Sequence, residues 1–253
     1  MQSFGKTDIG KKRNINQDYV FFSDDKIGCF PNLYIVADGM GGHRAGDKAS
    51  SYAVTRFVEL SKKTERDIPF LTMGKLIQQV NEEIFRMSGT QAQYEGMGTT
   101  FVAATVIGDI VYIMNIGDSR LYYYNGESLR QMTMDHSLVE ELVRAGELRR
   151  EESRYHPQKN IITRALGVAE TAEPDYFMTN ISEGQKLLLC SDGLSNMVED
   201  DKLAEILSSE DEPEVLVDRC IDEALFYGGI DNIAVVIARF SSPDLRMGGE
   251  GCD

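Results

Sequence analysis

The chain has few basic residues, few cysteines and no long apolar run. Lys and Arg together number 26 against 41 Asp and Glu, so the 253 residues carry a formal net charge of −15. A protein that binds nucleic acid normally presents a basic face, and this balance argues against such a partner. Repeated apolar stretches such as Leu187–Leu189 and Ala234–Ile237 exclude an intrinsically disordered chain.

The four cysteines, Cys29, Cys190, Cys220 and Cys252, show no spacing typical of metal or redox motifs. No CxxC pair occurs, and two of them lie in apolar runs, so we expect a reducing compartment and no zinc site. The N-terminus lacks the apolar core of a signal peptide. No window reaches the roughly 18 uncharged apolar residues of a membrane span. We expect a soluble, cytoplasmic and monomeric protein.

No internal repeat and no Pro/Ser-rich linker interrupts the chain before its last dozen residues. Its length suits one large domain, because sheet-rich domains often run to about 200–250 residues as a single unit. We therefore expect a single domain over residues 1–240 and a loose tail over residues 241–253.

Short runs rich in β-branched and aromatic residues predict strands. Asn125-Gly126 lies between two such runs, and because Asn and Gly tolerate positive φ, it predicts a hairpin whose strands pair antiparallel. The predicted strands are 19–22, 33–37, 99–107, 110–116, 121–124, 187–190 and 232–240.

Helical periodicity occurs in paired segments between the strands. Pro213 suits the first turn of one helix, and Ser137 with Glu140 forms a capping-box pattern at the start of another. Strict alternation of strand and helix is absent, so an α+β fold of antiparallel sheets covered by helices is predicted, not a parallel doubly wound sheet. The predicted helices are 49–60, 73–87, a short one that ends at Gly146, and 217–225.

Aspartates lie at the ends of four predicted strands. Asp38, Asp118 and Asp192 each follow an apolar run, and Asp231 directly precedes one. Like charges that converge at one sheet edge repel each other unless a cation lies between them. Mg²⁺ and Mn²⁺ prefer the oxygen ligands that carboxylates and carbonyls offer. The pattern therefore indicates a divalent-cation site.

Glycines accompany these aspartates. Gly39 follows Asp38, and glycine also adjoins Asp118 and Asp192. A residue without a Cβ lets the backbone approach a ligand closely and present a carbonyl to a metal. One Asp-Gly pair alone is most often a simple turn, and that alternative stays open for each of them. Three such pairs at strand ends favour the metal site.

Six short motifs stand in a fixed order along the chain: Arg13-Asn14-Ile15-Asn16-Gln17-Asp18, the segment from Asp38 to His43, Gly98-Thr99-Thr100, Gly117-Asp118-Ser119-Arg120, Ser191-Asp192-Gly193-Leu194, and Asp231-Asn232. In order and spacing they resemble the metal-dependent protein Ser/Thr phosphatases (PPM family, type 2C), and most of all the compact bacterial members. The resemblance implies a four-layer αββα sandwich, in which two antiparallel β-sheets are flanked by pairs of helices. It also implies a small flap subdomain at about residues 135–167.

The resemblance further implies a centre of two Mn²⁺ or Mg²⁺ ions, with a third, weaker ion in bacterial members. Asp38 would bridge the two ions, and the Gly39 carbonyl would bind one of them. The other implied ligands are Asp192 and Asp231 for the second ion, Asp18 through water, and Asp118 with Asp192 for the third ion.

The implied reaction is hydrolysis of phosphoserine and phosphothreonine monoesters, opposing a bacterial Ser/Thr protein kinase. A water held between two divalent cations loses a proton readily and can attack phosphorus in line, without a covalent phosphoenzyme. Arg13 is the candidate phosphate clamp, because guanidinium offers a planar fork of donors. The alternative for Arg13 is one more solvated charge in the basic run Lys11–Arg13.

Two histidines are candidates with open alternatives. Eukaryotic-type members carry a general-acid histidine directly after Asp-Gly, but here Met40 holds that position and His43 comes later. His43 is therefore either the general acid, a hydrogen-bonding scaffold at the start of the next helix, or neither. His156, in the flap, is either a substrate-side residue or a surface histidine.

Two other functional classes would leave different marks in the sequence. A non-catalytic or regulatory phosphoprotein-binding protein on the same fold would have lost a metal carboxylate or Arg13, and none is missing. A phosphatase with an aspartyl nucleophile needs Asp-x-Asp at a strand end, and that motif is absent. The flap carries balanced charges, which suit either a less negative lip for a phosphopeptide or a solvated helical hairpin.

Overall fold

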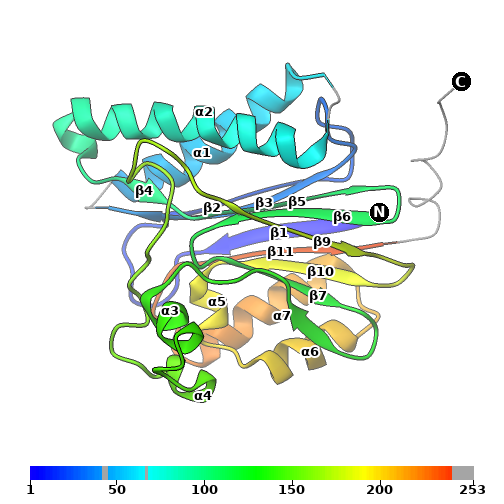
Figure 1. Ribbon diagram of the computed structural model, residues 1–253. Helices are drawn as coiled ribbons and strands as arrows, with labels where there is room; N and C mark the ends of the chain where they lie inside the picture. The colour runs from blue at the N-terminus through cyan, green and yellow to red at the C-terminus, as the bar shows by residue number, and fades with distance from the viewer. Residues whose placement is uncertain (42–44, 66–67, 241–253) are drawn as a thin grey trace, which may run out of the picture.

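The computed structural model describes residues 1–41, 45–65 and 68–240. Two antiparallel β-sheets stack face to face, and helices cover the outer face of each sheet (Figure 1). The predicted α+β sandwich of four layers is therefore what the chain forms. The predicted tail, residues 241–253, lies outside the described residues.

Both sheets place chain segments side by side that are far apart in the sequence. The first has the order β1 (Gln2–Asp8), β11 (Ile233–Arg239), β10 (Lys186–Cys190), β7 (Arg120–Tyr124) and β8 (Leu129–Gln131). The second has the order β2 (Asp18–Ser23), β3 (Leu33–Met40), β5 (Phe101–Ile107), β6 (Ile110–Ile116) and β9 (Asp175–Asn180), and short β4 (Gly98–Thr99) pairs with β3.

The helices fall into two outer layers and one end group. Helices α1 (Ala45–Lys62) and α2 (Pro69–Thr90) cover the second sheet, whereas α6 (Asp200–Ser208) and α7 (Pro213–Phe226) cover the first (Figure 1). The shorter elements are the 3₁₀ turn η1 (Ala92–Tyr94), α3 (Leu138–Arg144), α4 (Arg150–Ser153) and α5 (Asp192–Ser195).

Alternation along the central strands explains the layers. On β3, Leu33 and Ile35 pack into the apolar cluster beneath α1 and α2, whereas Tyr34 and Val36 pack into the cluster between the sheets. A third cluster, which includes Leu188, lies between the first sheet and α6 and α7. Because the central strands are buried on both faces, they are apolar throughout instead of alternating with polar residues.

Local signals set several boundaries. Pro213 is the first residue of α7, as predicted. The Asn125-Gly126 turn joins β7 to β8, with Gly126 at φ 99°. Ser137 caps α3 by accepting the Glu140 N–H at 3.3 Å, but the Glu140 carboxylate pairs with Arg150 instead of reaching back. The predicted capping box is therefore only half formed.

The cysteine and membrane expectations can be compared with the described residues. Cys29, Cys190 and Cys220 are buried free thiols, and Cys252 lies outside the described part of the chain. Among the described helices, none combines the length and the apolar composition that crossing a membrane requires.

Candidate metal centre

Two of the predicted aspartates face each other across a strand pair. Asp18, at the start of β2, is paired in register with Asp38 on β3, and Asp18 is 6% exposed. The pKa of Asp18 is raised to about 8, chiefly by burial and also by the charges of Asp192 and Asp231, while the hydrogen bond from the Ser191 hydroxyl lowers it. Burial, followed by the charges of Asp18 and Asp192, holds the pKa of Asp38 well above its usual range. The pair is thus unfavourable as two anions without a compensating cation.

Two more carboxylates adjoin this pair. Burial raises the pKa of Asp192 to about 6, with a further contribution from Asp231. Burial and the neighbouring charge of Asp192 hold the pKa of Asp118 well above normal, and Arg120 offsets this in part. One carboxylate oxygen of Asp18 and one of Asp118, Oδ1 in each case, are buried with no hydrogen-bond donor among the described residues. Orphaned buried acceptors of this kind are uncommon and suggest a missing cation or donor.

The backbone at Asp38 is held by the Gly98-Thr99-Thr100 segment. Thr100 Oγ1 accepts the Asp38 N–H at 2.9 Å, and the Thr100 N–H donates to the Asp38 carbonyl at 2.9 Å. Thr99 Oγ1 donates to the same carbonyl at 2.8 Å, and the Thr100 and Ser119 hydroxyls are 2.7 Å apart. These bonds fix the carboxylate at the end of β3 and connect it to the turn that carries Asp118.

Two glycines are required by backbone geometry at the centre. A Cβ on Gly39 would lie 2.0 Å from the Gly46 carbonyl oxygen, so only glycine lets the end of β3 touch the start of α1. Gly117 has φ 107°, a conformation that residues with a side chain rarely adopt, and it turns the chain so that Asp118 follows β6 directly. The fold therefore explains these two of the glycines in the sequence motifs.

Ser191 and Asn232 connect the centre to the loop between β1 and β2. The Ser191 hydroxyl donates to Asp18 Oδ2 at 2.6 Å and accepts the Ala234 N–H at 2.9 Å. Asn232 Oδ1 accepts the Gln17 N–H at 2.9 Å, and its amide donates to two carbonyls of the same loop. Asn232 is 4% exposed, so this junction is part of the interior.

Arg13 extends from this loop to the centre. Its Nη2 donates to Asp231 Oδ2 at 2.8 Å, in an ion pair that is half exposed on the arginine side. The bond to Asp231 raises the pKa of Arg13, and Asp38 and Asp192 add to that effect. The guanidinium therefore lies at the edge of the cluster of aspartate carboxylates, where a phosphate can reach it.

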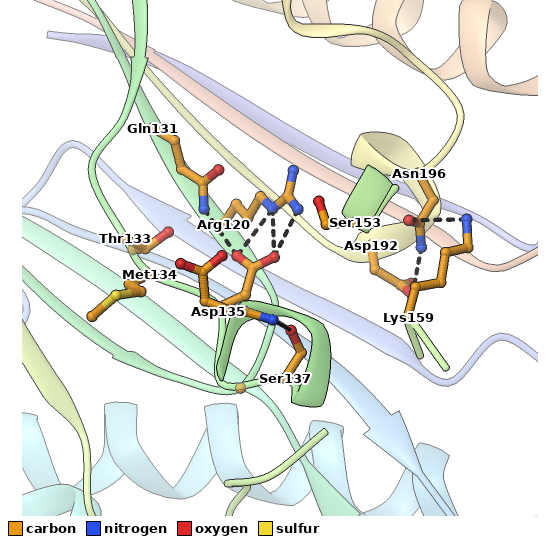
Figure 2. A network of polar contacts seen from close by, with 12 residues as sticks. Arg120, Gln131, Thr133, Met134, Asp135, Ser137, Ser153, Lys159, Asp192 and Asn196 are labelled. Atoms are coloured by element: carbon orange, nitrogen blue, oxygen red, sulfur yellow. Dashed lines mark hydrogen bonds and ion pairs between the residues drawn. The ribbon is translucent and has the colours of Figure 1, made fainter. Parts of the chain in front are cut away.

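On the opposite side the centre meets the flap, residues 135–167, which contains α3 and α4. Arg120 donates to both oxygens of Asp135, with its Nη2 2.7 Å from Asp135 Oδ2 (Figure 2). The His136 ring accepts the Gly117 N–H on Nδ1 at 3.2 Å, and the backbone N–H of His136 donates to the Gly117 carbonyl at 3.0 Å. The first two flap residues therefore hold the turn that carries Asp118 from both sides.

A second contact runs from the flap to Asp192. The Asn196 amide donates to Asp192 Oδ2 at 2.9 Å, and the Lys159 ammonium donates to Asn196 Oδ1 at 3.4 Å (Figure 2). Beside these residues lies a cavity of about 550 Å³, which Asp118 and Asp192 line together with flap residues. The carboxylate group is thus open to solvent on the flap side.

The donor set suits hard divalent cations, which take carboxylate and carbonyl oxygens and retain water. In the described part of the chain, no three acidic, histidine or cysteine side chains lie close enough together to hold a metal ion by themselves. Bound ions would therefore keep water in their coordination shell, and the unpaired oxygens of Asp18 and Asp118 are the acceptors that ions or their waters would satisfy.

The structure brings together the five aspartates and Arg13 that the sequence indicated, but not His156. His43 lies outside the described residues. His156 Nδ1 accepts the Gln158 N–H at 3.2 Å within its own turn, and His156 is not among the residues that line the cavity.

Three residues that hold the centre were not singled out from the sequence: Ser191, Asn196 and Asn232. Ser191 and Asn232 adjoin predicted ligands in the sequence, and Asn196 lies four residues after Asp192, one helical turn away.

Comparison with known proteins identifies the chain's family. The family profile described as Protein phosphatase 2C matches residues 7–215. The chain belongs to this family. The serine/threonine phosphatase Stp of Listeria innocua is 44% identical over 241 residues, which cover 92% of this chain and 93% of that protein. The predicted enzyme class, a protein phosphatase, is confirmed by this membership.

Solved phosphatase structures show the same fold. Serine/threonine phosphatase Stp1 from Staphylococcus aureus superimposes with a TM-score of 0.88 at 32% identity, over 96% of each chain. The catalytic domain of the phosphatase PstP, whose structure is a complex with two manganese ions, gives a TM-score of 0.83 at 32% identity, over 95% of this chain and 98% of that one. The αββα architecture predicted for this phosphatase is confirmed.

Proposed function

We propose that this phosphatase hydrolyses phosphoserine and phosphothreonine monoesters in proteins and uses Mn²⁺ or Mg²⁺ bound at the carboxylate group. One observation carries the proposal: buried carboxylates with unpaired oxygens converge beside a guanidinium at the rim. The names of the relatives, which are serine/threonine phosphatases, support the substrate class. The biological partners would be phosphorylated proteins and the Ser/Thr kinase that modifies them.

Asp38 and the Gly39 carbonyl, with Asp192 and Asp231, are the proposed ligands of two ions, and Asp18 would act through water. Asp118 with Asp192 is the proposed site of a third ion. When bound, such ions supply a nucleophilic water at neutral pH and neutralise charge on the phosphoryl oxygens. The residues of the chain would hold the ions and orient the phosphate.

Arg13 orients the phosphate in this proposal. Its pairing with Asp231 shows that the guanidinium reaches the carboxylate group. With Asp231 engaged as a metal ligand, the two Nη groups of Arg13 would be available as a planar pair of donors for phosphoryl oxygens. His43 remains the candidate general acid and His156 a candidate substrate contact, both as proposals from the resemblance.

The decisive experiment measures phosphate release from a phosphothreonine peptide by the full chain. We expect turnover with Mn²⁺, none with excess chelator, and none for Asp192→Ala. Asp211→Ala, at a surface carboxylate that pairs with Arg219 and with none of the proposed ligands, is the matched control and should behave as wild type. Full turnover in chelator would contradict the metal mechanism. Tight peptide binding with Mn²⁺ and no release would instead support the non-catalytic alternative.

A further inference from the structure

Exposed apolar side chains occur on two segments beside Asp231. Ile9 and Ile15, in the loop between β1 and β2, are 39% and 37% exposed. Phe226, Tyr227 and Ile230, between the end of α7 and the start of β11, are 77%, 57% and 51% exposed. Single exposed apolar residues are ordinary, but several on adjoining segments at the edge of an active site suggest a binding surface.

These two segments are joined by their backbones. The Lys11 N–H donates to the Gly229 carbonyl at 2.7 Å, and the Asn232 amide donates to the Ile9 and Ile15 carbonyls at 2.9 and 3.0 Å. Gly10 lies so close that a Cβ there would be 2.1 Å from the Asp231 carbonyl oxygen. The segments therefore form one preformed surface, which loses little entropy when it binds a partner.

The same loop carries an unusual concentration of positive charge for a chain of −15. Lys11, Lys12 and Arg13 follow one another and are exposed. Arg13 pairs with Asp231, whereas neither lysine forms an ion pair with any residue of the described ranges. We call Ile9, Lys11, Lys12, Ile15, Phe226, Tyr227 and Ile230 the β1–α7 surface. It combines apolar contacts with unpaired cations, and so it fits an anionic, partly apolar partner.

The cavity on the flap side has the opposite character. Its three arginines are already engaged in ion pairs, Arg120 with Asp135, Arg150 with Glu140 and Arg154 with Glu199, and its one lysine, Lys159, donates to Asn196. Glu151, Asp200 and Asp201, which also line it, form no ion pair with a described residue. An acidic polypeptide is therefore disfavoured there and favoured on the β1–α7 surface.

We propose that the β1–α7 surface docks the polypeptide on one side of the phosphorylated residue and selects substrates with an apolar or aromatic side chain near the phosphate, accompanied by acidic residues. The proposal rests on the proposed function, because Arg13 and Asp231 mark where the phosphate lies. Phe226 precedes Asp231 by five residues, so their Cα atoms are at most about 18 Å apart. An extended substrate would thus place its apolar side chain within about five residues of the phosphate.

The test compares phosphothreonine peptides with a small aryl phosphate, using the full chain with Mn²⁺. One peptide series carries two Glu and a single Phe, placed in turn two to five positions before or after the phosphothreonine. In the matched series Ala replaces Phe. p-Nitrophenyl phosphate reports on the metal centre alone, because it has no polypeptide to dock.

For at least one Phe position we expect a KM well below that of the matched Ala peptide. Phe226→Ser should raise that KM about tenfold, the size expected when one anchor contact is lost, and leave kcat unchanged. Lys12→Ser should raise it less and weaken its dependence on ionic strength. The control Phe85→Ser, at an aromatic residue of α2 that is 39% exposed, should match wild type. Hydrolysis of p-nitrophenyl phosphate should be the same for all four proteins.

Several outcomes would overturn this assignment. One is an equal KM for the Phe and Ala series in wild type, and another is an unchanged peptide KM in Phe226→Ser. Sedimentation of wild type, but not of Phe226→Ser, with phosphatidylserine vesicles, together with an unchanged peptide KM, would assign the surface to membranes. A concentration-dependent dimer lost in Phe226→Ser, with an unchanged peptide KM, would assign it to a second copy. Failure of the proposed function would give a different result from each of these outcomes, because wild type would then not hydrolyse p-nitrophenyl phosphate at all.

Discussion

Carboxylates in the flap and at the metal centre are compensated in opposite ways. In the flap, the buried carboxylate of Glu140 is met by two donors of Arg150. At the centre, Asp18 and Asp118 are equally buried, yet each keeps one oxygen without a donor among the described residues. A buried charge without a partner is costly, whereas a paired one approaches balance.

This difference separates structural charges from functional ones. In and beside the flap, Glu140 and Asp135 are met by arginines of the same chain, so these two carboxylates need no cation from outside it. The centre gathers anions whose pKa values are raised chiefly by burial and next by one another. Such a group gains stability when a divalent cation binds, because the cation interacts with the folded chain and much less with the unfolded one. The next predictions test this contrast, beginning with the centre.

Replacing the carboxylate common to both proposed ions should have the largest effect. We expect Asp38→Ala to lower phosphate release by about a thousandfold or more, since losing even one preorganised group that stabilises charge costs about 10²–10³. Titration calorimetry should show that tight Mn²⁺ binding is lost. The metal-free variant should unfold at no lower temperature than metal-free wild type, because a buried like charge has been removed. Near-normal turnover would contradict the assignment.

Asp118 tests whether the centre has an outer part. Asp118 follows β6, whereas the proposed inner ligands lie on or beside other strands: Asp38 on β3, Asp192 after β10 and Asp231 before β11. We expect Asp118→Ala to retain two tightly bound Mn²⁺ ions in calorimetry and to lower turnover about tenfold to a hundredfold, the usual size for a group outside the inner ligands. Loss of the inner ions as well would show that Asp118 belongs to the same site.

The pH dependence of the metal-free protein gives a smaller effect with a definite sign. The pKa of Asp18 is raised to about 8 and that of Asp192 to about 6, against about 3.9 in an unfolded chain. The folded state therefore binds these protons more tightly. The stability they contribute is fully present below about pH 4 and is lost as the pH rises through 6 and 8. Each group changes the free energy of unfolding by at most about 1.4 kcal/mol per pH unit.

Calorimetric melting between pH 5.5 and 8.5 can test this. In chelator we expect the melting temperature of wild type to fall as the pH rises, and saturating Mn²⁺ should remove or reverse the fall. Asp18→Asn should flatten the fall in chelator, because its amide oxygen can still accept the Ser191 hydroxyl without carrying charge. Asp211→Asn serves as the exposed control. A melting temperature that rises with pH in chelator would contradict the raised pKa values.

The sequence predicted the buried parts of this fold better than its edges. Strands β3, β5, β6, β10 and β11 are apolar on both faces and were predicted within a few residues. Strands β1 and β9 were missed. They lie at the edges of their sheets with half-exposed, mixed side chains, so neither an apolar run nor a strict alternation marks them. The pairing that makes an edge strand is a tertiary property.

The same distinction explains the site. Asp38, Asp118, Asp192 and Asp231 could be found from the residues because each adjoins an apolar strand. Asp18 was not singled out, although it directly precedes the predicted strand 19–22, because its role comes from the register that sets it opposite Asp38. That role came only from the resemblance to a known family. The Asn196 bond to Asp192 depends on α5, a four-residue helix with no periodicity to detect.

The flap completes the comparison with the smallest expected effect. Arg150→Ala removes the partner of Glu140 but touches no proposed ligand. Because the Arg150 side chain is 62% exposed, its removal opens the Glu140 carboxylate to water, so we expect a loss of about 1 kcal/mol or less, confined to α3 and α4. Hydrogen exchange should accelerate there, whereas the calorimetric binding of Mn²⁺ should not change. Arg149→Ala, at an exposed pair, is the control and should leave exchange nearly as in wild type. If Arg150→Ala weakened Mn²⁺ binding, the flap and the centre would share one electrostatic balance, because the charge of Glu140 would then act on the ions.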